Sequence, residues 1–158
     1  MKDLRSIRQF REQGTLRLFL LSVLTVGVYL AHYIKRQTFR INRLVDKEKA
    51  ISNALVYLIF IVSYGSLLAL IGSFFLGKGH PLESLSNWLY LFSTVMLIIW
   101  TFKAGARLNA HYEIDSGDII SFDRCWMFAF DVFYFNYNVN MICRYGIGHD
   151  SDTLPDTE

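Results

Sequence analysis

Residues 50–77, AISNALVYLIFIVSYGSLLALIGSFFLG, form an apolar run without a single charged side chain. A second uncharged run, residues 84–102 (SLSNWLYLFSTVMLIIWTF), begins after only six further residues, KGHPLE. A helix needs about 20 apolar residues to cross the hydrocarbon core of a bilayer, and both runs come close to that length or exceed it. The sequence therefore predicts two transmembrane helices joined by a short loop.

Composition agrees with one membrane domain. The 158 residues are 53% hydrophobic and 16% aromatic, which is above the usual apolar share of a soluble domain. We predict a basic amphipathic segment over residues 1–14, a single membrane domain over 15–145, and an acidic, disordered tail over 146–158. Cys125 and Cys143 are too few and too far apart for a metal or redox motif, so we interpret them as reduced packing residues.

The apolar segment over residues 15–34 is expected to stay in the protein, because it is long for a signal peptide and lacks a small-residue cleavage pattern. If it crossed the membrane once, six of the sixteen Lys and Arg residues would lie outside. If it instead enters and returns, only Lys78 is external, as the positive-inside rule favours. The sequence thus predicts a broken or re-entrant segment that breaks at Thr25, Val26 and Gly27, where glycine tolerates a positive φ.

Small residues recur at every fourth position of the first transmembrane run, at Gly65, Ala69 and Ser73. Such a face lets another helix backbone approach closely. Two interpretations remain open, packing against the second transmembrane helix or a homodimer interface. Trp88 and Trp100, near opposite ends of the second run, suit anchors at the two membrane surfaces.

Aromatic and polar residues are mixed over residues 121–143, which predicts an interfacial helix, straight or broken, that lies at the cytoplasmic surface or dips into it. It is the natural cover for the re-entrant turn, which needs protein or water around it. An aliphatic residue followed by asparagine closes three apolar segments, at Asn42, Asn109 and Asn140. An asparagine amide can bind a helix-end carbonyl or join neighbouring helices.

The sequence from Thr25 through Gly27 to Tyr29, followed by Tyr33, Lys35 and Arg36, resembles the opening signature of domain of unknown function 4234, a family of small bacterial membrane proteins. Near the other end, Tyr134, Asn136 and Asn140 resemble the closing pattern of that family, although Asn136 stands where glutamine is usual. The resemblance implies a bacterial inner-membrane protein and carries no established activity.

Few residues suggest chemistry. Asp131 is an ionisable group in an apolar aromatic stretch, which makes it a candidate for a proton or ion path, although pairing with a nearby cation is the simpler role. His32 is interpreted as an interfacial residue. His111, Glu113 and Asp115 could in principle hold a metal, but three neighbouring polar residues are more often only solvated. No motif predicts a catalytic residue, a cofactor or a metal site.

The basic residues are predicted to contact anionic lipid headgroups, and no nucleic-acid partner is needed to explain them. The principal ones are Arg5, Arg8, Arg11, Lys35 and Arg36. Both termini are expected to be cytoplasmic. Three functions remain open in this order: a non-catalytic scaffold or accessory subunit that binds another membrane protein or a second copy, a small transporter or channel component that uses Asp131, and a metal- or lipid-dependent enzyme.

Overall fold

The computed structural model describes residues 4–76, 80–115, 117–118 and 120–145. These residues are helical and contain no strand, as the all-α class predicts. The predicted acidic tail and Lys78 lie outside the described residues. In chain order the elements are the 3₁₀-helix η1 (Leu4–Phe10), α1 (Thr15–Leu24), α2 (Val28–Leu44), the 3₁₀-helix η2 (Lys47–Lys49), α3 (Asn53–Leu76), α4 (Pro81–Tyr112) and α5 (Arg124–Tyr145).

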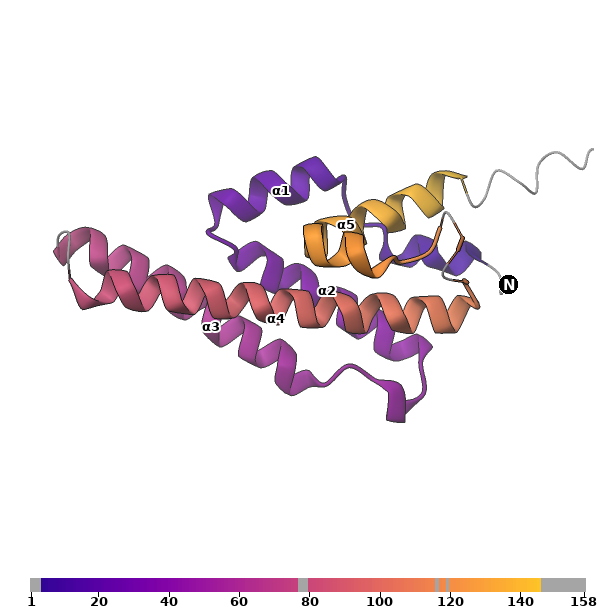
Figure 1. Cartoon of the computed structure of the whole chain (residues 1–158), viewed down its shortest axis with the longest axis horizontal. Helices are drawn as coiled ribbons and strands as arrows, with labels where there is room; N and C mark the ends of the chain where they lie inside the picture. The colour runs from indigo at the N-terminus through magenta and orange to yellow at the C-terminus, as the bar shows by residue number, and fades with distance from the viewer. Residues whose placement is uncertain (1–3, 77–79, 116, 119, 146–158) are drawn as a thin grey trace, which may run out of the picture.

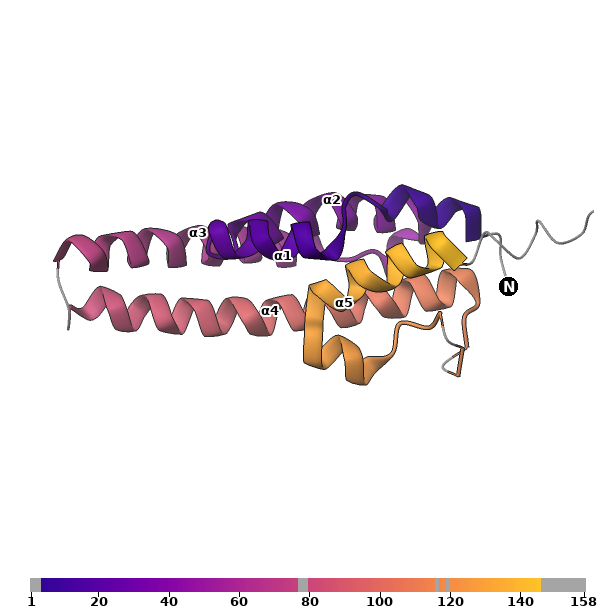
Figure 2. The ribbon, with the colours of Figure 1, turned by 90° about the horizontal axis from the view of Figure 1, so that it is seen from above.

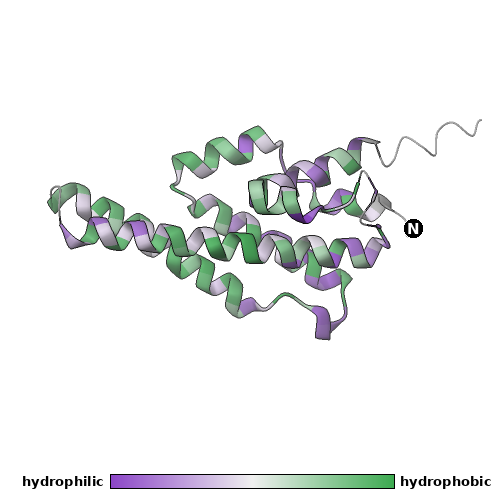
Figure 3. Cartoon of the chain, in the orientation of Figure 1, coloured by the Kyte–Doolittle hydropathy of each residue, from purple (hydrophilic) through white to green (hydrophobic). Residues whose placement is uncertain are grey.

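Helices α3 and α4 form a long antiparallel hairpin that determines the length of the molecule (Figure 1). Both are long and apolar enough to cross a membrane, and only 33% and 28% of their most apolar stretches are buried inside the protein. The remaining parts of these stretches place apolar side chains on the outside of the hairpin. Figure 3 shows hydrophobic residues along most of this hairpin and hydrophilic ones near η2 and the C-terminal end of α4.

Small polar residues hold the two long helices together. Ser63 Oγ lies 3.4 Å from Ser93 Oγ, and the hydroxyls of Ser66 and Ser86 each donate to the other residue's backbone carbonyl at 3.4 and 3.3 Å. A Cβ added at Gly65 would lie 3.6 Å from Leu89 Cδ1 on α4. Hydroxyl pairing and close approach of this kind are typical of helix packing within membranes.

The first apolar segment is broken, and its two halves run antiparallel. Helix α1 ends at Leu24 and α2 begins at Val28, with Gly27 in the left-handed region at φ 85°. The turn between them lies part of the way along the α3–α4 hairpin instead of reaching its end (Figures 1 and 2). The segment is therefore broken at the residues expected from the sequence and folds back on itself.

Helix α5 is also broken, because Asp131 has the non-helical angles φ 38° and ψ −124°. Its bend lets it pack on α4 and η1 and beside α1 (Figure 2). The aromatic core lies here, under α5, and includes the fully buried Trp100 and Phe135, whose ring centroids are 5.3 Å apart. The sequence-based interpretation of Trp100 as a membrane-surface anchor is therefore wrong, whereas Trp88 is 70% exposed.

Two segments gain detail from the structure. The second uncharged run ends at Phe102, but α4 continues as far as Tyr112, because Ala104, Leu108 and Tyr112 are buried and give that stretch a core-facing side. The basic N-terminal segment is a 3₁₀-helix over Leu4–Phe10. Its apolar residues repeat every third position, as three residues per turn require. Ile7 and Phe10 are fully buried, so this apolar face packs into the protein.

Candidate functional site

The α1–α2 turn is built by its own side chains. The hydroxyl of Thr25 donates to the carbonyl of Leu21 at 2.7 Å and accepts from the backbone N–H of Tyr29 at 3.0 Å. The hydroxyl thus bonds a backbone carbonyl in the last turn of α1 and a backbone N–H in the first turn of α2. Val26 at φ 50° and Gly27 at φ 85° supply the two positive φ angles between them, of which only the glycine adopts such an angle freely. The threonine and glycine of the family signature therefore make the break.

The base of the same hairpin converges on Gln13, just before α1. Tyr29 Oη donates to Gln13 Oε1 at 2.9 Å. Asn136 Nδ2 and Asn140 Nδ2 of α5 both donate to the backbone carbonyl of Gln13, at 3.2 and 3.0 Å. Asn136 Nδ2 also lies 3.1 Å from Thr15 Oγ1. Residues from both predicted signatures thus meet at a glutamine that neither signature contains.

Tyr33 extends this polar cluster into the core. Its hydroxyl donates to Asn136 Oδ1 at 3.1 Å, and its side chain is fully buried. Burial raises the pKa of the Tyr33 phenol, and the nearby Glu12 carboxylate adds to the rise. The phenol therefore stays a neutral donor and locks the orientation of the Asn136 amide.

Glu12 balances two cations of α2. Its carboxylate pairs with Arg36 at 2.9 Å and with Arg40 at 2.5 Å, while Arg36 lies over the Tyr29 ring at 5.8 Å. Glu12 is the only acidic residue between Asp3 and Asp46. That isolation within a basic stretch is the sequence signal that could have identified it. Arg36, predicted to contact lipid headgroups, thus forms an intramolecular ion pair, with 42% of its side chain still exposed.

Two further asparagines perform one repeated task. Asn42 Nδ2 donates to the carbonyl of Ile51 at 2.9 Å, while its Oδ1 accepts from the Ile51 N–H at 2.7 Å. Asn109 makes the same two bonds to Phe122, at 3.2 and 3.0 Å. Each asparagine lies near the C-terminal end of its helix and bonds both the N–H and the C=O of one residue in the chain that follows. A neighbouring β-strand would satisfy these backbone groups in the same way. The predicted asparagine repeat is structural.

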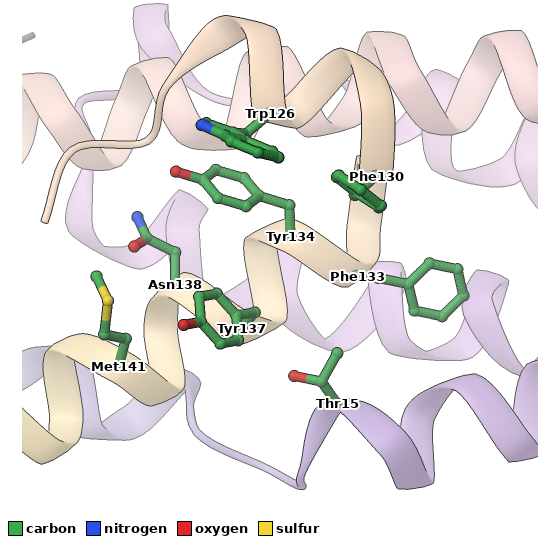
Figure 4. A pocket seen from close by; sticks show the side chains of 8 residues that line it. All are labelled: Thr15, Trp126, Phe130, Phe133, Tyr134, Tyr137, Asn138 and Met141. Atoms are coloured by element: carbon green, nitrogen blue, oxygen red, sulfur yellow. The ribbon is translucent and has the colours of Figure 1, made fainter. Parts of the chain in front are cut away.

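Beside this cluster lies an aromatic groove of about 490 Å³ between α1 and the bent α5 (Figure 4). Trp126 stacks on Phe130 and on Tyr134, with ring centroids 5.7 and 6.5 Å apart. Its lining residues are Thr15, Trp126, Phe130, Phe133, Tyr134, Tyr137, Asn138 and Met141. The Oδ1 atom of buried Asn138 has no hydrogen-bond partner. The groove therefore has mainly apolar, aromatic walls, and the unpartnered Asn138 Oδ1 is a buried atom of one lining residue.

The other predicted residues fall in different places. Gly65 and buried Ala69 pack within the chain, while the Ser73 hydroxyl donates to the Leu70 carbonyl of its own helix. His32 Nε2 lies 2.9 Å from Tyr64 Oη on α3. Lys35 Nζ lies over the Phe60 ring at 5.5 Å.

The basic side chains of Arg8 and Arg11 are exposed, and the Arg5 side chain lies outside the described part of the chain. His111 lies in α4, and Glu113 follows that helix in the left-handed region at φ 54°. Within the residues that the structure describes, no three His, Cys, Asp or Glu side chains form a group that could hold a metal ion.

Together these features define an all-helical protein with two helices of membrane-spanning length and a broken hairpin closed by a bent aromatic helix. The chain belongs to the family described as Domain of unknown function (DUF4234), whose model matches residues 13–110. The match includes Gln13, Thr25, Gly27 and Tyr29, and it ends before α5. No curated protein and no solved structure matches the chain.

Proposed function

We propose that the chain is a multi-pass protein of the bacterial inner membrane and serves there as a non-catalytic scaffold for another membrane protein. In this arrangement α3 and α4 cross the bilayer, the α1–α2 hairpin enters and returns, and both termini are cytoplasmic. The arrangement is supported by the basic loop of α2 and η2, which lies at the end of the molecule opposite the α3–α4 turn (Figure 1). Basic residues favour the cytoplasmic side.

The observation that carries the scaffold proposal is the uncovered face of α1. Leu16, Leu20 and Leu24 are 72%, 52% and 78% exposed, and their spacing of four residues aligns them on one side of the helix. Helix α5 covers a different side, where Phe133 contacts Phe19 with ring centroids 5.7 Å apart. A hairpin that turns inside a bilayer needs protein or water around its turn. A transmembrane helix of a partner, laid along the leucines, would complete that cover.

The aromatic groove offers a second contact for the same partner. Trp126 and Tyr137 are 55% and 54% exposed, and the groove lies beside the start of α1 (Figure 4). Rigid aromatic side chains at the rim of a pocket are frequent anchors in protein interfaces. The small-residue face of α3 is a poorer candidate, because Gly65 and Ala69 already pack inside the chain.

A photoreactive amino acid introduced at Leu20, in native membranes, tests the proposal. We expect a protein adduct of one defined mass that is lost when Trp126 and Tyr137 are both changed to alanine. The matched control is the same amino acid at Leu68 of α3, which is 67% exposed on a lipid-facing helix. Adducts to lipid alone at Leu20 would overturn the proposal. An adduct between two copies of this chain would replace the foreign partner with a homo-oligomer.

A further inference from the structure

A separate cavity of about 370 Å³ lies where the α1–α2 turn meets the middle of α3 and α4. All five α-helices contribute to its lining. Asp131 and Tyr90 are its only titratable lining residues, and no Lys, Arg or His of the described chain lines it. Val23 of α1 is 61% exposed and Tyr90 of α4 is 60% exposed, so the cavity opens between these two helices.

Several hydroxyl groups that line this cavity donate their hydrogen to a backbone carbonyl. Ser22 donates to the Leu18 carbonyl at 2.6 Å, Thr94 to Tyr90 at 3.1 Å, and Ser66 to Ser86 at 3.4 Å. Each donation leaves two acceptor lone pairs on the hydroxyl oxygen. The cavity therefore presents acceptors far more than donors to whatever enters it.

The carboxylate of Asp131 adds a negative charge to these acceptors. Backbone N–H groups of Val132 and Phe133 bind it, so it caps the second half of α5. A carboxylate has about four acceptor positions, and these two bonds leave others free. The carboxylate therefore has hydrogen-bond acceptors around it and no cationic side chain of the lining to pair with. A charge buried in this way is stabilised by binding a cation.

We propose that this cavity binds a small organic ammonium ion with an apolar body. An ammonium group has only donors, which matches a carboxylate surrounded by hydroxyl oxygens. A bare inorganic cation would fill a small part of 370 Å³, whereas an apolar body can pack against Phe19 and Phe133 in the same lining. The ring faces there can also attract the cation. The cavity shares Phe133 with the aromatic groove, but the binding proposed here does not depend on the scaffold function.

The competing explanation is that Asp131 only caps its helix. Asparagine caps a helix about as well as aspartate, so Asp131→Asn removes the charge and keeps a cap. Asp123 provides a matched control on the same helix, because its Oδ1 accepts from the backbone N–H groups of Cys125 and Trp126 at 2.8 and 3.2 Å. Asp123 does not line the cavity.

The experiment measures binding of benzylammonium to the full chain in neutral-detergent micelles by calorimetry, with benzyl alcohol as the uncharged match. We expect the wild type and Asp123→Asn to bind the ammonium ion, and Asp131→Asn to bind it about tenfold or more weakly. Equal binding of benzyl alcohol, or unchanged binding by Asp131→Asn, would overturn the proposal, as would binding of Na⁺ without the amine. Val23→Trp, which obstructs the opening, should also reduce binding and covers the case that Asp131→Asn does not fold.

Discussion

Asn136 Nδ2 donates to the backbone carbonyl of Gln13 at 3.2 Å, across 123 positions of sequence. The bond fastens the second half of α5 to the chain just before α1, and the amide oxygen of Asn136 accepts from Tyr33 Oη of α2 at 3.1 Å. One buried side chain therefore connects three helices at the base of the α1–α2 hairpin. Asn136 bonds through both its amide nitrogen and its amide oxygen, whereas the neighbouring Gln13 Nε2 is buried without a hydrogen-bond partner.

Replacing Asn136 with leucine should loosen this base. Leucine has a similar volume, but it removes the acceptor of the buried Tyr33 hydroxyl and leaves the Gln13 carbonyl with Asn140 as a donor. An unsatisfied buried group costs about 1–3 kcal/mol, so we expect the free energy of unfolding to fall by at least that amount. Thermal unfolding in neutral detergent measures the change. Asn87→Leu on the exposed surface of α4 is the control and should leave the midpoint nearly unchanged; equal midpoints for both variants would contradict a structural role for Asn136.

Gly27→Ala should destabilise the α1–α2 turn. Gly27 has φ 85°, and no atom lies within 4 Å of an added Cβ, so the cost would come from the backbone and not from a clash. A left-handed conformation costs a residue with a Cβ about 1 kcal/mol or more. Limited proteolysis at the turn and the unfolding midpoint would both report it. Gly14→Ala is the matched control, because Gly14 has equal space and φ −66°; a similar loss there would argue against this explanation.

Gly105→Ala tests the contact between α4 and the start of α5. An added Cβ would lie 2.5 Å from Met127 Sδ and 3.0 Å from Phe122 Cβ, so α5 must shift or Met127 must change rotamer. Overpacking of a core typically costs about 1–3 kcal/mol. Gly65→Ala is the control, since its nearest contact at 3.6 Å is ordinary packing. We expect Gly65→Ala to be neutral or slightly stabilising, because alanine favours helices. A larger loss of stability for Gly65→Ala than for Gly105→Ala would contradict this explanation.

Much of the fold could be predicted because its signals are local. The uncharged runs give α3 and α4, and Thr25 and Gly27 mark the break, since both act within one helical turn of their own position. The bent α5 contacts α1 and so covers one side of the hairpin. The position of Trp100 was misjudged because its indole donates to Thr38 at 2.8 Å, a contact between segments 62 positions apart.

The candidate sites were harder to predict because they are assembled from distant segments. Gln13 has no local pattern, yet side chains of α2 and α5 both bond to it just before α1 begins. The cavity acceptors come from serines whose pairings, such as Ser63 with Ser93, depend on the register of two helices. Asp131 could be flagged from its apolar neighbours alone. Its role as a helix cap required the backbone break to be seen.

Asp131 provides the last prediction, which concerns pH. Burial raises the pKa of its carboxyl from 3.8 to about 6, more than the N–H groups of Val132 and Phe133 lower it. A raised pKa means that the folded state holds the proton more tightly, so the stabilising contribution is complete below pH 3.8 and is lost as the pH rises through 6. At about 1.36 kcal/mol per pKa unit the ceiling is about 3 kcal/mol. Asp131→Asn should therefore raise the unfolding midpoint more at about pH 8 than at about pH 5, whereas Asp123→Asn retains Asp131 and should follow the wild-type slope. An equal gain by Asp131→Asn at both pH values would show that the carboxyl titrates alike in the folded and unfolded chain.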